Sequence, residues 1–346
     1  MNIGIVTIQS VNYGNRLQNY ALQETLKKRG FSVQSLRRSP NGALWKSLVA
    51  VRDLLKNDWV KAFRDFDKQF VELSDLVLST KKISADINAS FDKFVIGSDQ
   101  VWNPDFSFNS ELEYLPMIDA NKKLAYAASF GVSSIHRNAS RTAELLNDIP
   151  YISVREDAGA VIVRELTGRD VPVVLDPTLL VSVEDWSLVA KKPKCIDGIE
   201  SPFVFKYVLG SDVNGEAIEV FARECDLAII DAMDPSNRVG PSEFVWLIAN
   251  SSMVCTDSFH ASVFALLHHK PLAIFERVSD DADMSSRFDT LCRLFGLRGH
   301  RSSEKEFCLN AVKRNDWAAF EARLSNLRLH SEKWLDDALG DVGAND

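Results

Sequence analysis

The chain has 346 residues, 46% of them hydrophobic, and carries 40 lysines and arginines against 48 aspartates and glutamates, a formal charge of −8. This apolar content excludes intrinsic disorder, and the length favours two domains, because single cores stop growing at about 250–300 residues. The acidic balance disfavours a nucleic-acid-binding protein, since such surfaces usually show as an excess of basic residues.

The cysteines and the first residues indicate the compartment. Neither a zinc site nor a disulfide framework is expected, because the five cysteines are widely spaced and form no Cys-x-x-Cys pair. The first nine residues lack the basic region of a secretory signal, and no apolar run approaches the roughly 18 residues that span a bilayer. We therefore expect a cytoplasmic protein with reduced thiols and no transmembrane segment.

The opening of the chain predicts a βαβ unit. Residues 3–8 form an apolar run, and apolar side chains then recur at helical spacing from Leu17 to Leu26 until Gly30 ends the pattern. A second strand is expected at 31–33. Strands joined by a helix pair in parallel, so the sequence indicates an α/β fold.

Further elements follow in two series. Residues 44–78 carry aromatic side chains at helical spacing and predict one or two amphipathic helices. The remaining apolar runs predict strands at 94–96, 124–127, 151–154, 171–175, 203–208, 227–230, 252–255 and 272–275, and a last helix at 316–339. We expect two Rossmann-like parallel-sheet domains facing a cleft, at 1–170 and 171–346, with the last helix packing back onto the first domain. Ligands of such sheets bind beyond the carboxyl ends of the strands.

The loop after the first strand is the first candidate. Asn12, Gly14 and Asn15 precede the first helix, where a glycine admits a ligand to the backbone and the helix N-terminus favours an anion. The alternative is an ordinary turn with Asn15 as the N-cap. A Gly-x-Gly-x-x-Gly dinucleotide fingerprint is absent.

The loop after residues 94–96 is the second candidate. Ser98 and Asp99 follow the strand, and Trp102 comes shortly after. Asp99 would accept a proton from a sugar hydroxyl, and Trp102 would stack on a pyranose ring. The alternative places Trp102 in the core and makes Asp99 a turn cap.

Two arginines are candidate anion clamps. Arg155 follows the strand at 151–154, and its guanidinium suits a carboxylate or phosphate through two parallel hydrogen bonds. Arg287 lies after an acidic stretch, 280–283, and would add a second cation. The alternatives are a salt bridge of Arg155 to Glu156 or Asp157 and an ion pair of Arg287 within the acidic stretch.

The segment from Cys255 to Ala265 is the richest. A strand ends in Thr256-Asp257-Ser258, and the following helix carries His260 in its first turn, where the helix dipole helps hold an anion. His260 is therefore a candidate acid or base. A single histidine is more often structural, but Asp257 and Ser258 at a strand end favour a functional role.

Together these segments resemble the polysaccharide pyruvyl transferase family. The matching pieces run in order along the chain: Asn12-Tyr13-Gly14-Asn15, residues 95–102, Ser129-Phe130-Gly131, Ser153-Val154-Arg155-Glu156, residues 175–180, and Thr256-Asp257-Ser258-Phe259-His260-Ala261. The resemblance implies a glycosyltransferase-B-like fold, with the acceptor on the N-terminal domain and phosphoenolpyruvate on the C-terminal domain.

The resemblance also implies an activity. Enolpyruvyl transfer from phosphoenolpyruvate to two hydroxyls of a sugar, free or lipid-linked, would give a pyruvate ketal and phosphate in exopolysaccharide or cell-surface glycan biosynthesis. This chemistry requires no metal or redox cofactor. His260 would be the proton donor, Arg155 and Arg287 the clamps, and Asp99 or Asp257 the base.

One position departs from the family pattern. Many members carry arginine two residues before the histidine, where this chain has Ser258; Arg155 or Arg287 would then supply the lost cation, or the donor differs. Two alternatives stay open: a nucleotide-sugar-dependent glycosyltransferase of the same fold, and a non-catalytic saccharide-binding member of a polymer assembly complex. The sequence also leaves a homo-oligomer open.

Overall fold

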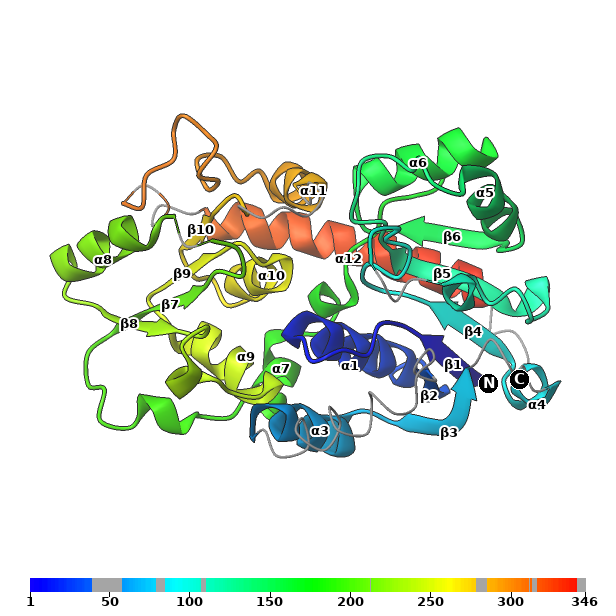
Figure 1. The fold of residues 1–346 in the computed structure, drawn as a ribbon, viewed down its shortest axis with the longest axis horizontal. Helices are drawn as coiled ribbons and strands as arrows, with labels where there is room; N and C mark the ends of the chain where they lie inside the picture. Colours follow the sequence, from blue (N-terminus) through cyan, green and yellow to red (C-terminus); the bar gives the residue numbers. More distant parts are fainter. Residues whose placement is uncertain are drawn as a thin grey trace. The chain divides into compact units, whose positions relative to one another are not determined.

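A computed structural model describes residues 1–38, 58–78, 85–106, 110–211, 213–277, 285–310, 312 and 316–340. These residues form two compact α/β units (Figure 1). The first unit contains residues up to 38, 67–180 and 325–340, and the second contains 58–66 and 181–324, within the described ranges. Each unit has one parallel sheet, which confirms the prediction of two parallel-sheet α/β domains.

The first sheet has the strand order of a Rossmann fold. Its order is β3-β2-β1-β4-β5-β6, and neighbouring strands pair in parallel. The chain reverses its direction across the sheet between β1 and β4, which pair with Val6 opposite Ile96. The strands are β1 (Asn2–Val6), β2 (Ser32–Arg38), β3 (Leu73–Leu78), β4 (Lys93–Ile96), β5 (Lys123–Ala128) and β6 (Tyr151–Val154).

Helices cover this sheet, so its central strands are apolar on both sides. Phe94, Val95 and Ile96 of β4 are all fully buried, which explains why they form a continuous apolar run and not an alternating one. The helical elements are α1 (Tyr13–Lys27), α3 (Asp58–Phe70), whose last residues belong to this unit, α4 (Ala85–Ser90), η1 (Glu111–Tyr114), η2 (Ala120–Lys122), α5 (Ala139–Asn147), α6 (Asp157–Thr167) and η3 (Pro177–Leu179).

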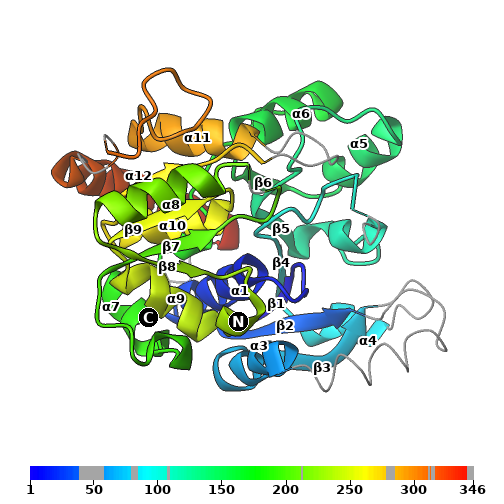
Figure 2. The same cartoon turned by 60° about the vertical axis from the view of Figure 1, so that its left-hand side comes forward.

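The second sheet is smaller and has the order β10-β9-β7-β8, of which β9, β7 and β8 are labelled in Figure 2. Here the direction reverses between β7 and β9, which pair with Tyr207 opposite Thr256. The strands are β7 (Phe203–Tyr207), β8 (Ala228–Asp231), β9 (Met253–Thr256) and β10 (Leu272–Ile274). The helical elements are α7 (Val183–Val189), η4 (Lys194–Ile196), α8 (Gly215–Glu224), η5 (Pro235–Asn237), α9 (Pro241–Asn250), α10 (Phe259–Leu267) and α11 (Ser286–Phe295).

The last helix, α12 (Trp317–Leu339), contributes to both units. Its residues up to Leu324 belong to the second unit and those from Ser325 to the first. Near its end, Leu335 and Leu339 join the buried cluster that contains Ile3 of β1. No helix in the described ranges is both long enough and apolar enough to cross a membrane.

Two sequence-based assignments differ from the structure. The predicted helical stretch 44–78 contains helix α3 followed by strand β3, and its part from 44 to 57 lies outside the described residues. The predicted strand 171–175 forms only an isolated bridge between Val173 and Val154 and belongs to the first unit, which continues to Leu180. Pro172 lacks the N–H that a further ladder bond requires, which limits this segment to the edge of β6.

Candidate active site

Each sheet gathers polar side chains at its topological switch point, where ligands of open α/β sheets bind. In the first unit, the loops after β1 and β4 meet there, and the Thr7 hydroxyl donates to the carbonyl of Ser98 over 3.0 Å. In the second unit, the loops after β7 and β9 meet, and the Thr256 hydroxyl donates to the carbonyl of Tyr207 over 2.6 Å. Looking for sites beyond the carboxyl ends of the strands therefore gives two groups of residues, one in each unit.

Gly97 shapes the loop that follows β4. Its φ is +109°, and a Cβ atom there would lie 2.5 Å from the carbonyl oxygen of Tyr126, so no other residue fits. The next residue, Ser98, is fully buried, and its hydroxyl lies 3.0 Å from a carboxylate oxygen of Asp176. The loop thus turns Ser98 and Asp99 inwards.

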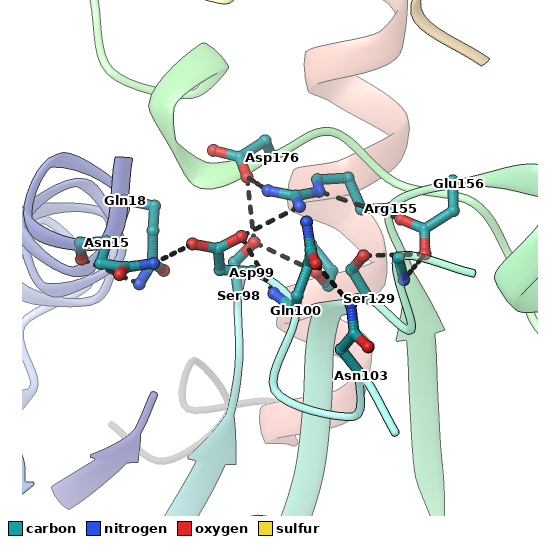
Figure 3. A network of polar contacts seen from close by, with 12 residues as sticks. Asn15, Gln18, Ser98, Asp99, Gln100, Asn103, Ser129, Arg155, Glu156 and Asp176 are labelled. Carbon is teal, nitrogen blue, oxygen red and sulfur yellow. Dashed lines mark hydrogen bonds and ion pairs between the residues drawn. The ribbon is translucent and has the colours of Figure 1, made fainter. Parts of the chain in front are cut away.

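Arg155 lies at the centre of the first polar network (Figure 3). One Nη atom donates to Asp176 over 2.7 Å and the other to Asp99 over 3.1 Å, and the Arg155 side chain is 1% exposed. Burial alone lowers the pKa of Arg155, but Asp99 and Asp176 raise it, and the pKa lies above its ordinary value. The guanidinium therefore stays charged and joins the ends of β4 and β6.

This placement differs from the role of anion clamp that the sequence suggested for Arg155. Its guanidinium already faces two carboxylates, so a further anion there meets negative charge. Asp99, the suggested base, accepts bonds at both oxygens, from Arg155 and from the amide of Asn15, and is 5% exposed. The group positions loops instead of offering free reactive atoms.

The N-terminal candidates belong to the same network. Asn12, not Asn15, is the N-cap of α1, and its side chain accepts from the backbone N–H of Asn15 over 3.4 Å. Asn15 and Gly14 are buried in the first helical turn. Because the Asn15 side chain bonds both Ser10 and Asp99, it links α1 to the loop after β4.

Trp102 has the core position that the alternative interpretation described. It is 1% exposed and stacks on Tyr114 at a centroid distance of 5.4 Å, with its indole N–H donating to the carbonyl of Glu113 over 3.2 Å. Tyr114 covers one face of the indole and Phe130 packs against it at 5.2 Å. A sugar ring therefore has no free indole face on which to stack.

Asp257 holds the switch point of the second unit together. Its two carboxylate oxygens accept the backbone N–H groups of Leu209 and Gly210, each over 2.8 Å, and Nε of Arg277 donates over 3.1 Å. The Asp257 side chain is fully buried. The sequence suggested a base here, but the carboxylate instead fixes the loop after β7 against the loop after β9.

We expect the Asp257→Asn variant to lower the free energy of unfolding of the second unit by about 1–3 kcal/mol. The NH₂ group of asparagine would face N–H groups that now donate to the carboxylate, so these donors would lose their acceptor. At about 2–4 °C per kcal/mol, the melting temperature falls by about 2–12 °C. Calorimetry measures this shift. The control is Asp197→Asn, whose carboxylate is 69% exposed and whose contact to Lys192 is 3.7 Å long. An unchanged melting temperature for Asp257→Asn would contradict the positioning role.

His260 and Arg287 both contact the ring of Phe259. Ser258 is the N-cap of α10, and His260 lies in the first turn with its ring perpendicular to that of Phe259 at 5.4 Å. The Arg287 guanidinium lies over the same phenyl ring, 5.8 Å from its centroid. The N-terminal end of a helix, an imidazole and a guanidinium thus meet beside the switch point, an arrangement that suits an anion.

Two residues of these groups had not been singled out as site residues. Asp176 ends a buried apolar segment and caps η3, accepting from the N–H of Thr178 over 3.0 Å. Arg277 follows the last strand of its sheet. Asp176 directly follows an apolar strand-like run, as Arg155 does, and Arg277 follows such a run after one further residue, Glu276, so the same signal could have found both.

The charged groups are suited to anions and not to metals. Among the residues that the structure describes, no three His, Cys, Asp or Glu side chains are placed to hold a metal ion. In the second unit Arg287 and His260 both contact the ring of Phe259, and Arg277 is paired with Asp257. An anionic small molecule is therefore the ligand class that this group favours.

Comparison with known families agrees with this chemistry. Residues 12–277 match the family model described as polysaccharide pyruvyl transferase, which covers both switch points. The chain belongs to the polysaccharide pyruvyl transferase family. No curated protein matches its sequence.

Solved structures show the fold of this pyruvyl transferase family member. It aligns with the UDP-GlcNAc 2-epimerase of Methanocaldococcus jannaschii with a TM-score of 0.53 and 11% identity, covering 96% of this chain and 99% of the other. A putative UDP-N-acetylglucosamine 2-epimerase of Listeria monocytogenes gives 0.51 and 10%, covering 100% and 97%. Identity this low shows the fold alone, and it confirms the expected glycosyltransferase-B-like architecture.

Proposed function

We propose that this protein transfers the enolpyruvyl group of phosphoenolpyruvate to two hydroxyls of one sugar residue, forming a pyruvate ketal during exopolysaccharide or cell-surface glycan biosynthesis. The observation that carries the proposal is the grouping of His260 and Arg287 at the N-terminal end of α10. Family membership supports the transferase class and a sugar acceptor. A cytoplasmic location and the use of no cofactor belong to the same proposal.

The reaction fixes which groups are needed. Two C–O bonds form at the central carbon of phosphoenolpyruvate, and the bond from that carbon to the phosphate oxygen breaks. Of the two hydroxyl protons, the balance places one on the methylene carbon, which becomes a methyl group, and one on the phosphate. The site must therefore donate a proton to carbon and hold a carboxylate and a phosphate.

The second unit supplies these groups. His260 is the proton donor, and Arg287 binds the carboxylate or phosphate, assisted by the N-terminal end of α10. Arg277 adds positive charge while its Nε holds Asp257. This chain has Ser258 where many family members carry an arginine, two residues before the histidine. We assign the missing cation to Arg287, whose guanidinium lies over the ring of the neighbouring Phe259, because Arg155 is bound to carboxylates.

A thermal-shift titration tests the donor without requiring the acceptor. A ligand at 100 times its dissociation constant stabilises the native state by about 2.7 kcal/mol. We expect phosphoenolpyruvate to raise the melting temperature and UDP-glucose, UDP-N-acetylglucosamine and GDP-mannose to leave it unchanged. A rise with a nucleotide sugar alone would replace the proposal with a glycosyltransferase, and no rise with any ligand would favour a non-catalytic saccharide-binding protein.

Replacing Arg287 with alanine is expected to weaken phosphoenolpyruvate binding by about 10–100-fold, because hydrogen bonds to charged groups contribute about 1.5–3 kcal/mol. Titration calorimetry of both proteins measures the ratio. Arg298→Ala makes the same charge change at an exposed position and is the matched control. If both variants weakened binding equally, the effect would come from the change in net charge, and Arg287 would not be a binding residue.

A further inference from the structure

The first unit contains a cavity of about 310 Å³ that the proposed chemistry does not use. It lies between residues 102–106 and 110–114 on one side and residues 135–145, which include the first turns of α5, on the other. This volume is at the lower end of the roughly 300–1,000 Å³ of small-molecule sites. The lining residues used in the argument below are Trp102, Phe106, Glu111 and Tyr114 on the first side and Ile135, Arg137, Asn138, Arg141 and Thr142 on the second.

The walls of the cavity are held by interactions among themselves. Arg141 donates to both oxygens of Glu111, from Nε over 2.8 Å and from Nη2 over 2.7 Å, and so connects α5 to η1. Tyr114 stacks on Trp102, and its hydroxyl bonds the Thr142 side chain. The cavity is therefore bounded on two sides by elements that fix one another, which pre-organises it for a ligand.

The lining combines two kinds of surface. Apolar carbon comes from the half-buried Phe106 and Ile135, and donors and acceptors come from Asn138, Thr142 and the Arg141–Glu111 pair. Arg137 is exposed and makes no ion pair with any residue in the described ranges. A pyranose presents hydroxyls around its rim and C–H groups on its faces, so it matches such a lining.

We propose that this cavity binds one sugar ring of the acceptor glycan. The inference rests on the proposed function, which requires a saccharide acceptor. The half-buried ring of Phe106 contacts the apolar face of the sugar, and Asn138 and Arg137 bond its hydroxyls. Trp102 and Tyr114 are both buried and form a fixed wall of the cavity, and neither is the stacking platform.

Saturation-transfer NMR tests the site, with free glucose, galactose, mannose, N-acetylglucosamine and N-acetylmannosamine as probes. Thr142→Trp fills the cavity from α5, and Ser140→Trp places the same side chain at an exposed position of the same helix that does not line the cavity. We expect at least one sugar to receive saturation from the wild type and from Ser140→Trp, and none from Thr142→Trp. Arg137→Ala removes an exposed side chain with little risk to folding, and we expect it to weaken binding of that sugar about tenfold.

Two results overturn the inference. One is the absence of saturation transfer from the wild type to all five sugars. The other is unchanged sugar binding in both Thr142→Trp and Arg137→Ala. Titration of the wild type with phosphoenolpyruvate is scored separately, so loss of the cavity as a sugar site leaves the donor proposal standing, and failure to bind phosphoenolpyruvate removes the proposed function whatever the sugars do.

Discussion

The Arg155→Met variant is expected to lose about 3–5 kcal/mol of the free energy of unfolding of the first unit. Methionine leaves the buried carboxylates of Asp99 and Asp176 facing each other without the guanidinium that now lies within 3.1 Å of both. At about 2–4 °C per kcal/mol, the melting temperature of this unit falls by about 6–20 °C. Calorimetry measures this shift. Arg155→Lys should recover only part of the loss, because one ammonium group cannot bond both carboxylates as the two Nη atoms of the guanidinium do.

The control for this prediction is Arg164→Met. Arg164 is 61% exposed and lies 3.7 Å from Asp170, and exposed pairs contribute about 0–1 kcal/mol. Arg155→Met could instead keep the melting temperature of the wild type and lose its stabilisation by phosphoenolpyruvate. That result would support Arg155 as an anion clamp. The two readouts therefore separate the positioning role from the binding role.

The His260→Ala variant is expected to turn over about 10²–10⁴-fold more slowly than the wild type while still binding phosphoenolpyruvate. Protonation of the methylene carbon needs a donor, and Arg287 keeps its charge for the anion when the imidazole is removed. The assay follows phosphate released from phosphoenolpyruvate in the presence of glycan extracted from the source cells. The thermal shift with phosphoenolpyruvate reports binding separately.

His330→Ala is the matched control for His260→Ala, because His330 is an exposed residue of α12. It should keep wild-type turnover. If His260→Ala also kept near wild-type turnover, the proton donor would have to be another group. If it lost phosphoenolpyruvate binding instead, His260 would be a binding residue and not an acid.

Much of the fold could be predicted from the sequence because parallel strands buried on both faces are continuous apolar runs. The strands at 94–96 and 203–208 appear in the structure as β4 and β7. Strand β3 was missed because its residues, Leu73-Ser74-Asp75-Leu76-Val77-Leu78, follow an aromatic helix without a glycine or proline between them. The segment 171–175 was assigned as a full strand because pairing depends on neighbours that the local sequence does not specify.

The sequence predicted which loops form the candidate site, but not which groups their charged side chains contact. Strand ends locate the switch points, so the neighbourhoods of Asp99, Arg155 and His260 could be found from periodicity alone. What each charged group contacts depends on long-range pairing: the partner of Arg155 is Asp176, 21 residues away, and that of Asp257 is the loop at Leu209, 48 residues away. Residue type therefore suggested that Asp99 and Asp257 are reactive and that Arg155 binds an anion. In the structure these side chains bond one another or the backbone and hold the loops in place.

Helix α12 sets the order in which this protein can complete its folding during synthesis. Leu335 and Leu339 fill the same buried cluster as Ile3, yet they are synthesised after residues 181–324. At about 5–20 residues per second, the stretch 181–324 takes on the order of ten seconds to emerge, so the second unit is fully translated while the first still lacks this part of α12. The first unit is thus completed only after the second has been made, and a nascent chain held short of residue 325 exposes apolar surface that a chaperone can recognise.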